Sequence, residues 1–418
     1  MNTLLTPLLA ALLCTATLAR AADDADLAAL SLADTEAAPV APARDWQLFI
    51  EGAAGFGVDG AGGHDQSQRL SGSFSLDTRL APDWRLVLSD RLDQRWTGSF
   101  DDGDAVNTLR DAYLSWQAGD NTALDAGRIN TRYGVAMGYN PTDWFRANAI
   151  RSRVSEDPGS LRENRQGSVM LRGQQLWDGG AATALYSPEL SDIRRDGSFN
   201  LDLGATNYRD RGLLAVTTRI NDSLSPEWLL YRAAGGEPQL GANLTVLANA
   251  ATVAYVEWSG GRASSLAALA AGYDDSSFRN RLALGATYTT TSKLSLTLEY
   301  DYNGAGLDDA GWQALQAGSP LAYWRYRALV RDLQELPTRH AWFARAAWQD
   351  AIISHLDLTG MLRINGDDHS TLTWLEARYH WDKTDLALQW QMNRGDAGSE
   401  YGALAQRQFW QVLMTQYF

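Results

Sequence analysis

The chain has 418 residues, of which 45% are apolar and 21% are charged, with 37 glycines, 16 tryptophans, 16 tyrosines and one cysteine. This apolar and aromatic content is too high for a disordered chain, and one cysteine cannot build a disulfide framework or a cysteine-rich metal site. The formal net charge of -14 argues against a nucleic-acid partner, because such proteins carry a basic face. Past the first twenty residues, no apolar run approaches the roughly 20 residues that a membrane-spanning helix needs.

Residues 1–21 have the pattern of a cleaved signal peptide. A short apolar run ends at Ala19-Arg20-Ala21, which has the small-x-small form of a signal-peptidase site, although a buried first helix is the alternative. Cys14, the only cysteine, is then lost with the signal. Residues 22–44 are acidic and rich in Ala and Pro, so we expect a periplasmic tail there and a single folded unit over 45–418.

From residue 45 onward, segments of about ten residues alternate apolar and polar side chains, which is the period of a β-strand. In 293–302, Leu294, Leu296, Leu298, Tyr300 and Tyr302 share one face, and Lys293, Ser295, Thr297, Glu299 and Asp301 share the other. The segments, in chain order, are 46–57, 68–80, 84–95, 106–117, 121–132, 165–176, 180–187, 211–220, 226–233, 249–258, 264–272, 279–290, 293–302, 339–349, 353–364, 370–380, 384–393 and 406–418. Segment 238–248 leaves room for one or two more.

Three features favour a membrane barrel over a soluble sandwich, which also alternates. Aromatic residues such as Trp84 and Trp116 lie at the ends of the apolar faces, and the opposite faces carry charge in mid-strand. Connections alternate between short ones, including 221–225 and 259–263, and long ones. The sequence therefore predicts an all-β, transmembrane antiparallel β-barrel of 16–18 strands, with long extracellular or inward-folded loops and both termini in the periplasm.

The last strand carries an expected assembly signal. The chain ends FWQVLMTQYF, with Phe418 at its C-terminus and Met414, Val412 and Trp410 at alternate positions before it. This is similar to the terminal signal of bacterial outer-membrane barrels, although Gln416 stands where that signal usually has an apolar residue. The similarity implies the barrel-assembly machinery as a partner.

The densest cluster of charge lies between residues 125 and 172. Its long loop, 133–164, is predicted to fold inward and narrow the pore, because a loop of this length in a compact domain is usually functional. The alternative is that its arginines pair with neighbouring acids to hold the loop, or contact lipopolysaccharide phosphates. The candidate pore-lining residues are Arg128, Arg132, Asp143, Arg146, Arg151, Arg153, Arg162 and Arg165.

A second candidate region, 312–340, combines aromatic and arginine side chains. Its 321–336 portion is predicted to form a short amphipathic helix over the pore mouth, carrying the pore-lining candidates Arg325, Arg327 and Arg331. Such side chains suit stacking on sugar rings and pairing with uronate carboxylates. The alternative is a lid packed on its own aromatic residues.

The sequence offers no site for chemistry. The five histidines lack metal-ligand spacing, and neither a nucleophile motif nor a glycine-rich phosphate loop is present. We therefore expect no enzymatic activity, no cofactor and no metal.

Two short patterns resemble a known family. The run Gly127-Arg128, Tyr133-Gly134 and Asn140-Pro141-Thr142-Asp143-Trp144-Phe145 resembles the strand-loop signature of porin-like outer-membrane barrels, including the alginate-export type and uncharacterised relatives, and 298–304 is similar to a late strand of the same kind of protein. The resemblance implies a Gram-negative outer-membrane location, with lipid and lipopolysaccharide around the barrel.

The functional prediction is a porin-like channel for passive passage of small or anionic solutes through an Arg-rich lumen, because rings or ladders of arginine favour anions. The alternatives are an export pore for an anionic polysaccharide and a non-conducting barrel with a role in adhesion or envelope assembly.

Overall fold

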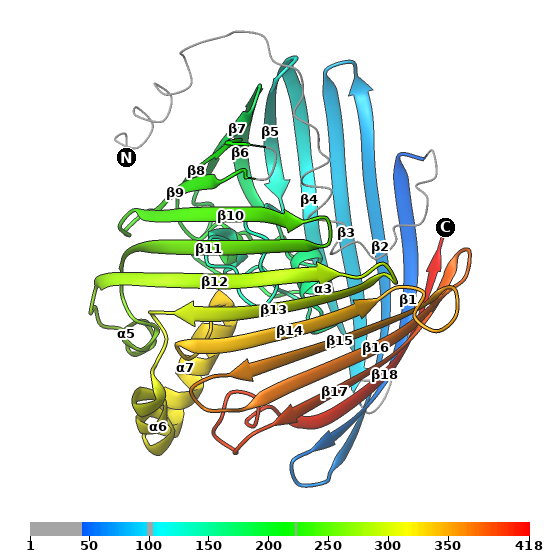
Figure 1. The fold of residues 1–418 in the computed structure, drawn as a ribbon, viewed down its shortest axis with the longest axis vertical. Coiled ribbons are helices and arrows are strands. Elements are labelled where there is room, and N and C mark those ends of the chain that lie inside the picture. The colour runs from blue at the N-terminus through cyan, green and yellow to red at the C-terminus, as the bar shows by residue number, and fades with distance from the viewer. Residues whose placement is uncertain (1–43, 98–102, 222–223) are drawn as a thin grey trace.

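The computed structural model describes residues 44–97, 103–221 and 224–418, and their strands form one closed sheet (Figure 1). The predicted signal peptide, and the predicted tail up to residue 43, lie outside the described residues. The eighteen strands found in the described residues are β1 (Trp46–Asp59), β2 (His64–Ala81), β3 (Trp84–Thr97), β4 (Gly103–Gly119), β5 (Thr122–Ile129), β6 (Ser168–Trp177), β7 (Gly180–Ser187), β8 (Arg211–Thr218), β9 (Glu227–Ala233), β10 (Gln239–Asn249), β11 (Thr252–Ala263), β12 (Ser277–Thr289), β13 (Leu294–Asn303), β14 (His340–Trp348), β15 (Leu356–Asn365), β16 (Thr371–His380), β17 (Thr384–Arg394) and β18 (Gln406–Tyr417).

Helices occur only in connections within this part of the chain. They are η1 (Trp144–Arg146), α3 (Pro158–Glu163), α4 (Leu203–Thr206), α5 (Leu266–Ala271), α6 (Asp309–Ala317) and α7 (Pro320–Leu333). None of these helices has both the length and the apolar character needed to cross a membrane.

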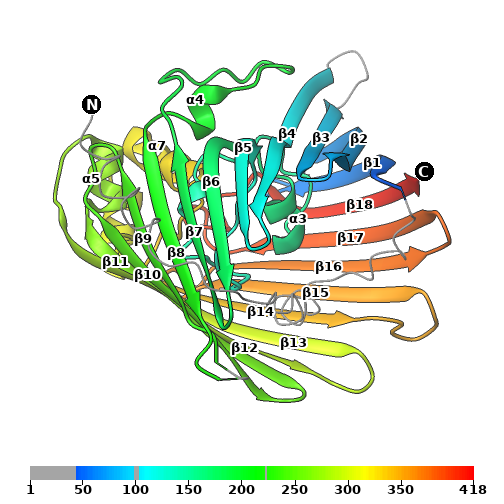
Figure 2. The same ribbon diagram turned by 90° about the horizontal axis from the view of Figure 1, so that it is seen from above.

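The sheet closes because its first strand pairs with its last. β1 is antiparallel to β2 on one side and to β18 on the other, with Phe49 opposite Tyr417 and Gly57 opposite Phe409. Closure gives each strand two neighbours, so the backbone groups of the wall find partners without water. The predicted antiparallel barrel is confirmed, and Figure 2 shows the ring of strands from a second direction.

The two ends of the barrel differ in the length of their connections. One end, the short-turn end, has connections such as 120–121, 178–179 and 250–251, and β1 begins and β18 ends there. The other end, the long-loop end, carries 130–167, 188–210 and 304–339, and α5, α6 and α7 are visible there at the lower left of Figure 1. This asymmetry is the one that the sequence predicted.

Side chains alternate between an apolar outer face and a polar inner face. On β13, Leu298 is 58% exposed, whereas Thr297 is 5% and Glu299 is 0% exposed. At the short-turn end the outward-facing rings of Trp84 and Trp116 stack with centroids 6.0 Å apart, as expected of an aromatic belt at a membrane interface.

One predicted strand is absent from the structure, and one segment that the sequence left open is a strand. Segment 264–272 was predicted as a strand, but 266–271 forms α5, because Ser265 caps its first turn and Gly272 ends it in a left-handed conformation. Segment 238–248, left open by the sequence, belongs to β10. The predicted short turn 259–263 is also wrong, since it lies inside β11 and the chain turns at 250–251.

One sector of the interior is apolar, although the sequence shows charge in mid-strand on many inward faces. The inner faces of β6 to β9 present Met170, Leu185, Leu213 and Leu229, which pack with Phe145 of the 130–167 loop. The 130–167 loop therefore packs on an apolar part of the inner wall.

The lipid-facing surface makes a stability prediction. Replacing Leu298 by Arg at the middle of β13 is expected to lower the free energy of unfolding by about 2–4 kcal/mol, the cost of a guanidinium near the bilayer midplane. Urea unfolding of the protein in lipid vesicles, followed by tryptophan fluorescence, measures it. Leu298→Ala is the control, and equal losses for both variants would mean that this face does not contact lipid.

Candidate functional site

The 130–167 loop, between β5 and β6, crosses the lumen to the opposite wall. The backbone N–H groups of Val135 and Ala136 donate to the Glu257 carboxylate on β11, and those of Met137 and Gly138 donate to Glu299 on β13 at 2.7 and 3.1 Å. The loop carries η1 and α3, and Figure 2 shows α3 enclosed by the strands. The predicted inward fold of this loop is therefore present.

The wall opposite β5 and β6 presents three carboxylates to the loop, and we call it the acidic wall. Glu257, Glu299 and Asp301 are all fully buried on inward positions. A Cβ on Gly138 would lie 2.6 Å from Asp301 Oδ2, so the backbone approaches this wall as only glycine allows. Arg363 on β15 donates to the Gly138 carbonyl at 3.1 Å. This acidic wall thus fixes the first half of the loop.

A basic wall faces the second half of the loop. Arg69, Arg91, Arg110 and Arg128 occupy inward positions on the consecutive strands β2 to β5, and each is at most 8% exposed. The guanidinium of Arg69 donates to the Val154 carbonyl at 3.1 Å.

Neighbouring carboxylates balance the charge of the basic wall. Arg110 pairs with Glu163 at 3.2 Å, and Glu51 pairs with Arg69 at 2.6 Å and with Arg91 at 3.1 Å. Of these arginines, only Arg128 was a sequence candidate. The others follow from the inward positions of β2 to β4 once strand pairing is known.

Most of the other arginines predicted to line the pore hold loops in place. Arg165 pairs with Asp143 at 2.8 Å, and both side chains are buried. Three further arginines donate to backbone carbonyls. Arg128 donates to those of Gly167 and Leu201, Arg151 to those of Asn107 and Asn200, and Arg162 to that of Ala136. Arg153 is exposed and pairs with Glu156 at 2.8 Å, and Arg132 is exposed.

The alternative of structural pairing therefore describes the buried arginines in the cluster. Whether Arg132 and Arg153 line a conducting path stays a prediction.

Arg146 joins the two longest loops. It pairs with Glu335, after α7, at 2.8 Å, and Tyr139 donates to the same carboxylate at 2.5 Å. Burial disfavours the charged carboxylate, yet the guanidinium of Arg146, with that of Arg281, holds the pKa of Glu335 below its usual value. A carboxylate that stays charged keeps the 130–167 and 304–339 loops together.

The predicted 321–336 helix is present as α7. Tyr323, Tyr326 and Val330 are buried in a cluster with Trp312 of α6 and Leu266 of α5. These buried rings pack on one another, as the lid alternative proposed, whereas Trp324 of the same helix is 55% exposed.

The three arginines of α7 differ in their contacts. Arg327 donates to the carbonyls of Ser399 and Glu400 at 3.1 and 2.8 Å. Arg331 donates to the adjacent Asp332 carboxylate, and Arg325 is exposed. Arg327 thus attaches the helix to the neighbouring loop, whereas Arg325 and Arg331 lie at the surface.

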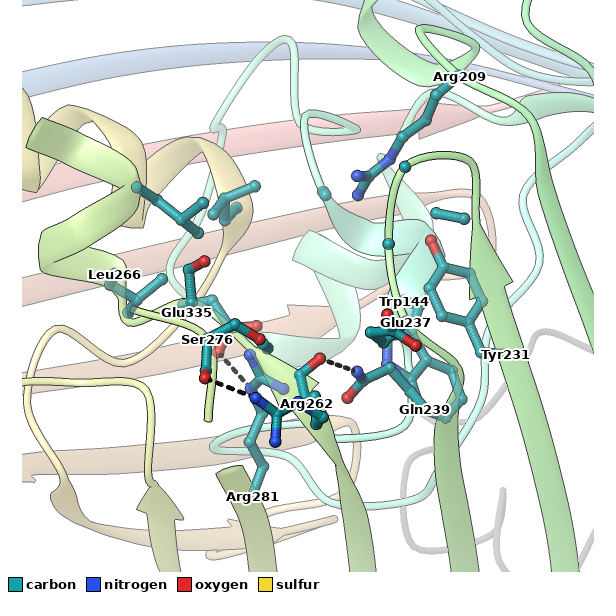
Figure 3. A pocket seen from close by; sticks show the side chains of 18 of the residues that line it. Trp144, Arg209, Tyr231, Glu237, Gln239, Arg262, Leu266, Ser276, Arg281 and Glu335 are labelled. Atoms are coloured by element: carbon teal, nitrogen blue, oxygen red, sulfur yellow. Dashed lines mark hydrogen bonds and ion pairs between the residues drawn. The ribbon is translucent and has the colours of Figure 1, made fainter. Parts of the chain in front are cut away.

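A cavity of about 460 Å³ opens between η1, the ends of β9 to β12, α5 and the C-terminal end of α7 with Glu335 (Figure 3). Its lining combines four guanidinium groups, four carboxylates and three aromatic rings, of which those of Trp144 and Tyr231 stack with centroids 4.9 Å apart. The charged residues are Asp143, Arg146, Arg209, Glu237, Arg262, Asp274, Arg281 and Glu335. Such a lining suits a small charged solute with an apolar portion.

Two arginines of this cavity have N–H donors that other described residues do not use. Arg262 donates from Nη2 to the Ser276 carbonyl at 3.1 Å and is otherwise exposed, and the buried Nε of Arg209 has no hydrogen-bond partner among the described residues. Sequence reasoning found Asp143 and Arg146 but missed Arg209, Arg262 and Arg281. These three lie at the ends of different strands and loops, and only the closed sheet brings them together.

Glu400 connects three loops at the long-loop end. Asn365 donates to its carboxylate at 2.8 Å, its own N–H donates to Asp368 at 2.6 Å, and Arg327 donates to its carbonyl. Burial, together with the nearby carboxylate of Asp368, raises the pKa of Glu400 to about 7.

The comparisons with known proteins rest on structure alone. No protein-family model matches the chain, and no curated protein matches it in sequence. Its fold matches Acinetobacter baumannii OccAB1 with a TM-score of 0.53 and 11% identity, over 89% of this chain and 96% of that one. It also matches Pseudomonas aeruginosa OccK5 (OpdH) with a TM-score of 0.55 and 9% identity, over 90% of this chain and 98% of that one. The match to Pseudomonas aeruginosa OccK7 (OpdD) has a TM-score of 0.51 and 13% identity, over 90% of this chain and 99% of that one.

These neighbours are outer-membrane porins. The chain has the fold of such porins. The porin-like part of the sequence resemblance is thereby confirmed, whereas the likeness to alginate-export barrels finds no support in these matches. At identities near 10%, the likeness establishes the fold.

The anchoring of the long loop is testable by hydrogen exchange. Glu299→Ala removes the acceptor of two amides, at a cost of roughly 1–3 kcal/mol for each group left unpaired. The amides of Met137 and Gly138 should therefore exchange faster than in the parent protein. Glu299→Gln retains an acceptor oxygen and should show a smaller increase. Unchanged exchange in Glu299→Ala would contradict the anchoring role.

The Glu400 contact predicts a pH dependence. The docked carboxyl keeps its proton up to about pH 7, whereas the undocked carboxyl releases it near its ordinary pKa of 4.5. Docking of 395–405 is therefore favoured fully below about pH 4.5 and is weakened as the pH rises through 7. A nitroxide at Leu404→Cys should become more mobile between pH 5 and 8.5. In a Glu400→Gln background this change should vanish; its persistence would contradict the assignment.

Proposed function

We propose that this protein is a Gram-negative outer-membrane channel for the passive passage of small solutes, with a preference for anions. The observation that carries the proposal is the 130–167 loop, which is fixed between an acidic wall and a basic wall and narrows a barrel of eighteen strands. Barrels of about this size are wide enough for a water-filled channel unless loops fill them. A loop held by charged walls leaves a narrow polar path beside it.

The orientation follows the usual plan of such barrels. The short-turn end lies in the periplasm and the long-loop end faces outside, where exposed loops meet lipopolysaccharide. Trp410, Val412, Met414 and Phe418 are exposed on the outer face of the last strand. There they are accessible to the barrel-assembly machinery before closure and to lipid afterwards.

The cavity of Figure 3 is the proposed first binding position for an entering solute. It lies among the loops of the long-loop end, and its guanidinium groups attract a carboxylate or phosphate while Trp144 and Tyr231 cover an apolar portion. The interleaved carboxylates limit the affinity, which a channel requires for release of the solute. This arrangement includes no catalytic step.

The two alternatives have less support. The aromatic residues of α7 that would contact a polysaccharide are mostly buried, with Tyr326 at 1% exposed. A non-conducting barrel requires the two long loops to fill the lumen completely, and the absence of current in the experiment below would favour it.

Planar-bilayer recording tests the proposal. The parent protein should conduct, with a reversal potential in a salt gradient that favours anions. Arg209→Gln with Arg262→Gln should lower the anion-to-cation permeability ratio about two- to threefold, the scale of a few tenths of a kcal/mol that partly exposed charges contribute. Arg232→Gln makes the same chemical change on the outer face of β9 and should leave the ratio unchanged. An equal effect of Arg232→Gln would refute a role for the cavity.

A further inference from the structure

One sector of the barrel wall, which we call the thin sector, is built from short strands. β5, β7 and β8 have eight residues each and β9 has seven, whereas a strand needs about 9–11 residues to cross the hydrocarbon of a bilayer. The neighbouring β4 has 17 residues and pairs with β5 only from Ala112 to Gly119. The rest of β4, 103–111, therefore extends past the end of β5 with no strand beside it on that side.

Residues 196–201 of the β7–β8 loop occupy this place. The Asn107 N–H of β4 donates to the Ser198 carbonyl at 2.9 Å, as it would to a neighbouring strand. Arg128 and Gln166 each donate to the Leu201 carbonyl at 2.7 Å. Figure 2 shows the loop that carries α4 lying alongside β4.

Arg151 adds side-chain hydrogen bonds between this segment and β4. Its guanidinium donates to the Asn107 carbonyl at 2.9 Å and to the Asn200 carbonyl at 2.8 Å, and it also reaches the carbonyls of Asp196 and Gly197 at 3.2 and 3.1 Å. One side chain thus supplies donors to one carbonyl of β4, which strand pairing would otherwise satisfy, and to three carbonyls of the loop.

The segment alternates like a strand of the wall. Phe199 and Leu201 are exposed by 73% and 55%, whereas Ser198 and Asn200 are partly covered and Asp202 is buried. Leu190 and Ile193, earlier in the loop, are also exposed. In 198–202 the exposed apolar side chains and the covered polar side chains therefore lie on opposite sides, whereas Asp192, Arg195 and Asp196, earlier in the loop, are exposed and charged.

The height of the segment is that of the outer leaflet. Asn107 lies nine residues along β4 from Trp116, the aromatic marker of the short-turn end. At about 3.4 Å per residue and a tilt near 40–45°, this places Ser198 roughly 23 Å above the tryptophan pair, within an apolar band about 25 Å tall. The lipid-facing Leu124 and Leu171 of β5 and β6 lie below it in the same sector.

We propose that segment 188–201 is a lipid-binding part of the barrel wall: Leu190, Ile193, Phe199 and Leu201 contact acyl chains of the leaflet at the long-loop end, and Arg151 positions the segment against β4. The proposal needs the barrel to sit in a bilayer, but it is independent of any transport function.

Spin-label accessibility tests the lipid contact. In a Cys14→Ser background of the full chain, a nitroxide is placed at Phe199→Cys in lipid vesicles, and its collisions with oxygen and with a water-soluble nickel complex are measured. The label should resemble one at Leu298→Cys, on the lipid face of β13, with frequent oxygen and rare nickel collisions. It should differ from one at Arg325→Cys on α7. A label as accessible to nickel as the one at position 325 would overturn the proposal.

Two further outcomes are decisive. If Phe199→Cys does not fold, Ile193→Cys gives the same comparison. Strong dipolar broadening between labels of different molecules, with neither reagent in contact, would identify a second copy of the chain as the occupant and would also overturn the lipid assignment.

The role of Arg151 is tested by a matched pair of variants. Arg151→Ala should make the label at position 199 mobile and accessible to the nickel complex. Arg153→Ala, which removes an exposed arginine paired only with Glu156, should leave the label unchanged. An immobile, lipid-exposed label in Arg151→Ala would refute the positioning role.

Discussion

The structure depends on one constraint, which is that backbone N–H and C=O groups away from water must find partners within the protein. The pairing of β1 with β18 meets this requirement for the wall. The 130–167 loop meets the same requirement inside the lumen, where no strand runs beside it. Carboxylates of Glu257 and Glu299 accept its amides instead. The acidic residues of the inner wall therefore have a structural reason to be there, whatever solute passes.

The polarity of the walls matches the polarity of the groups that the loop presents. Its first half offers N–H donors to the acidic wall, and its second half offers the Val154 carbonyl and the Glu163 carboxylate to Arg69 and Arg110 of the basic wall. Buried ion pairs add little net stability, because desolvation offsets their attraction, but they select one arrangement among many. The charges thus determine where the loop lies more than how strongly it is held.

Local patterns in the sequence were sufficient for the wall and for little beyond it. Alternation identified most strands, and loop length identified 130–167 as a lumenal element, because both signals are contained within one segment. The errors occurred where the local pattern was ambiguous, as in the Leu/Ala run of α5. The basic wall and the cavity were missed for a different reason. Arg69, Arg91 and Arg110 come from three strands, and Arg209, Arg262 and Arg281 come from separate ends, so their proximity exists only after the strand register is fixed.

The thin sector of the wall connects these features. Since β5 ends at Ile129 while β4 continues to Gly103, the chain leaves the wall well below the rim of its neighbour and enters the lumen at depth. A β5 as long as β4 would carry the loop to the mouth of the barrel, too far from Glu257 and Glu299 for the contacts observed. The same shortening exposes one edge of β4, which the 188–201 segment and Arg151 cover. It also accompanies an apolar inner face on β6 to β9, against which Phe145 packs. The short β5 strand, the 130–167 loop and the 188–201 segment therefore depend on one another. Because β5 is short, the 130–167 loop enters the lumen at depth and narrows it, and the 188–201 segment covers the edge of β4 that β5 leaves unpaired.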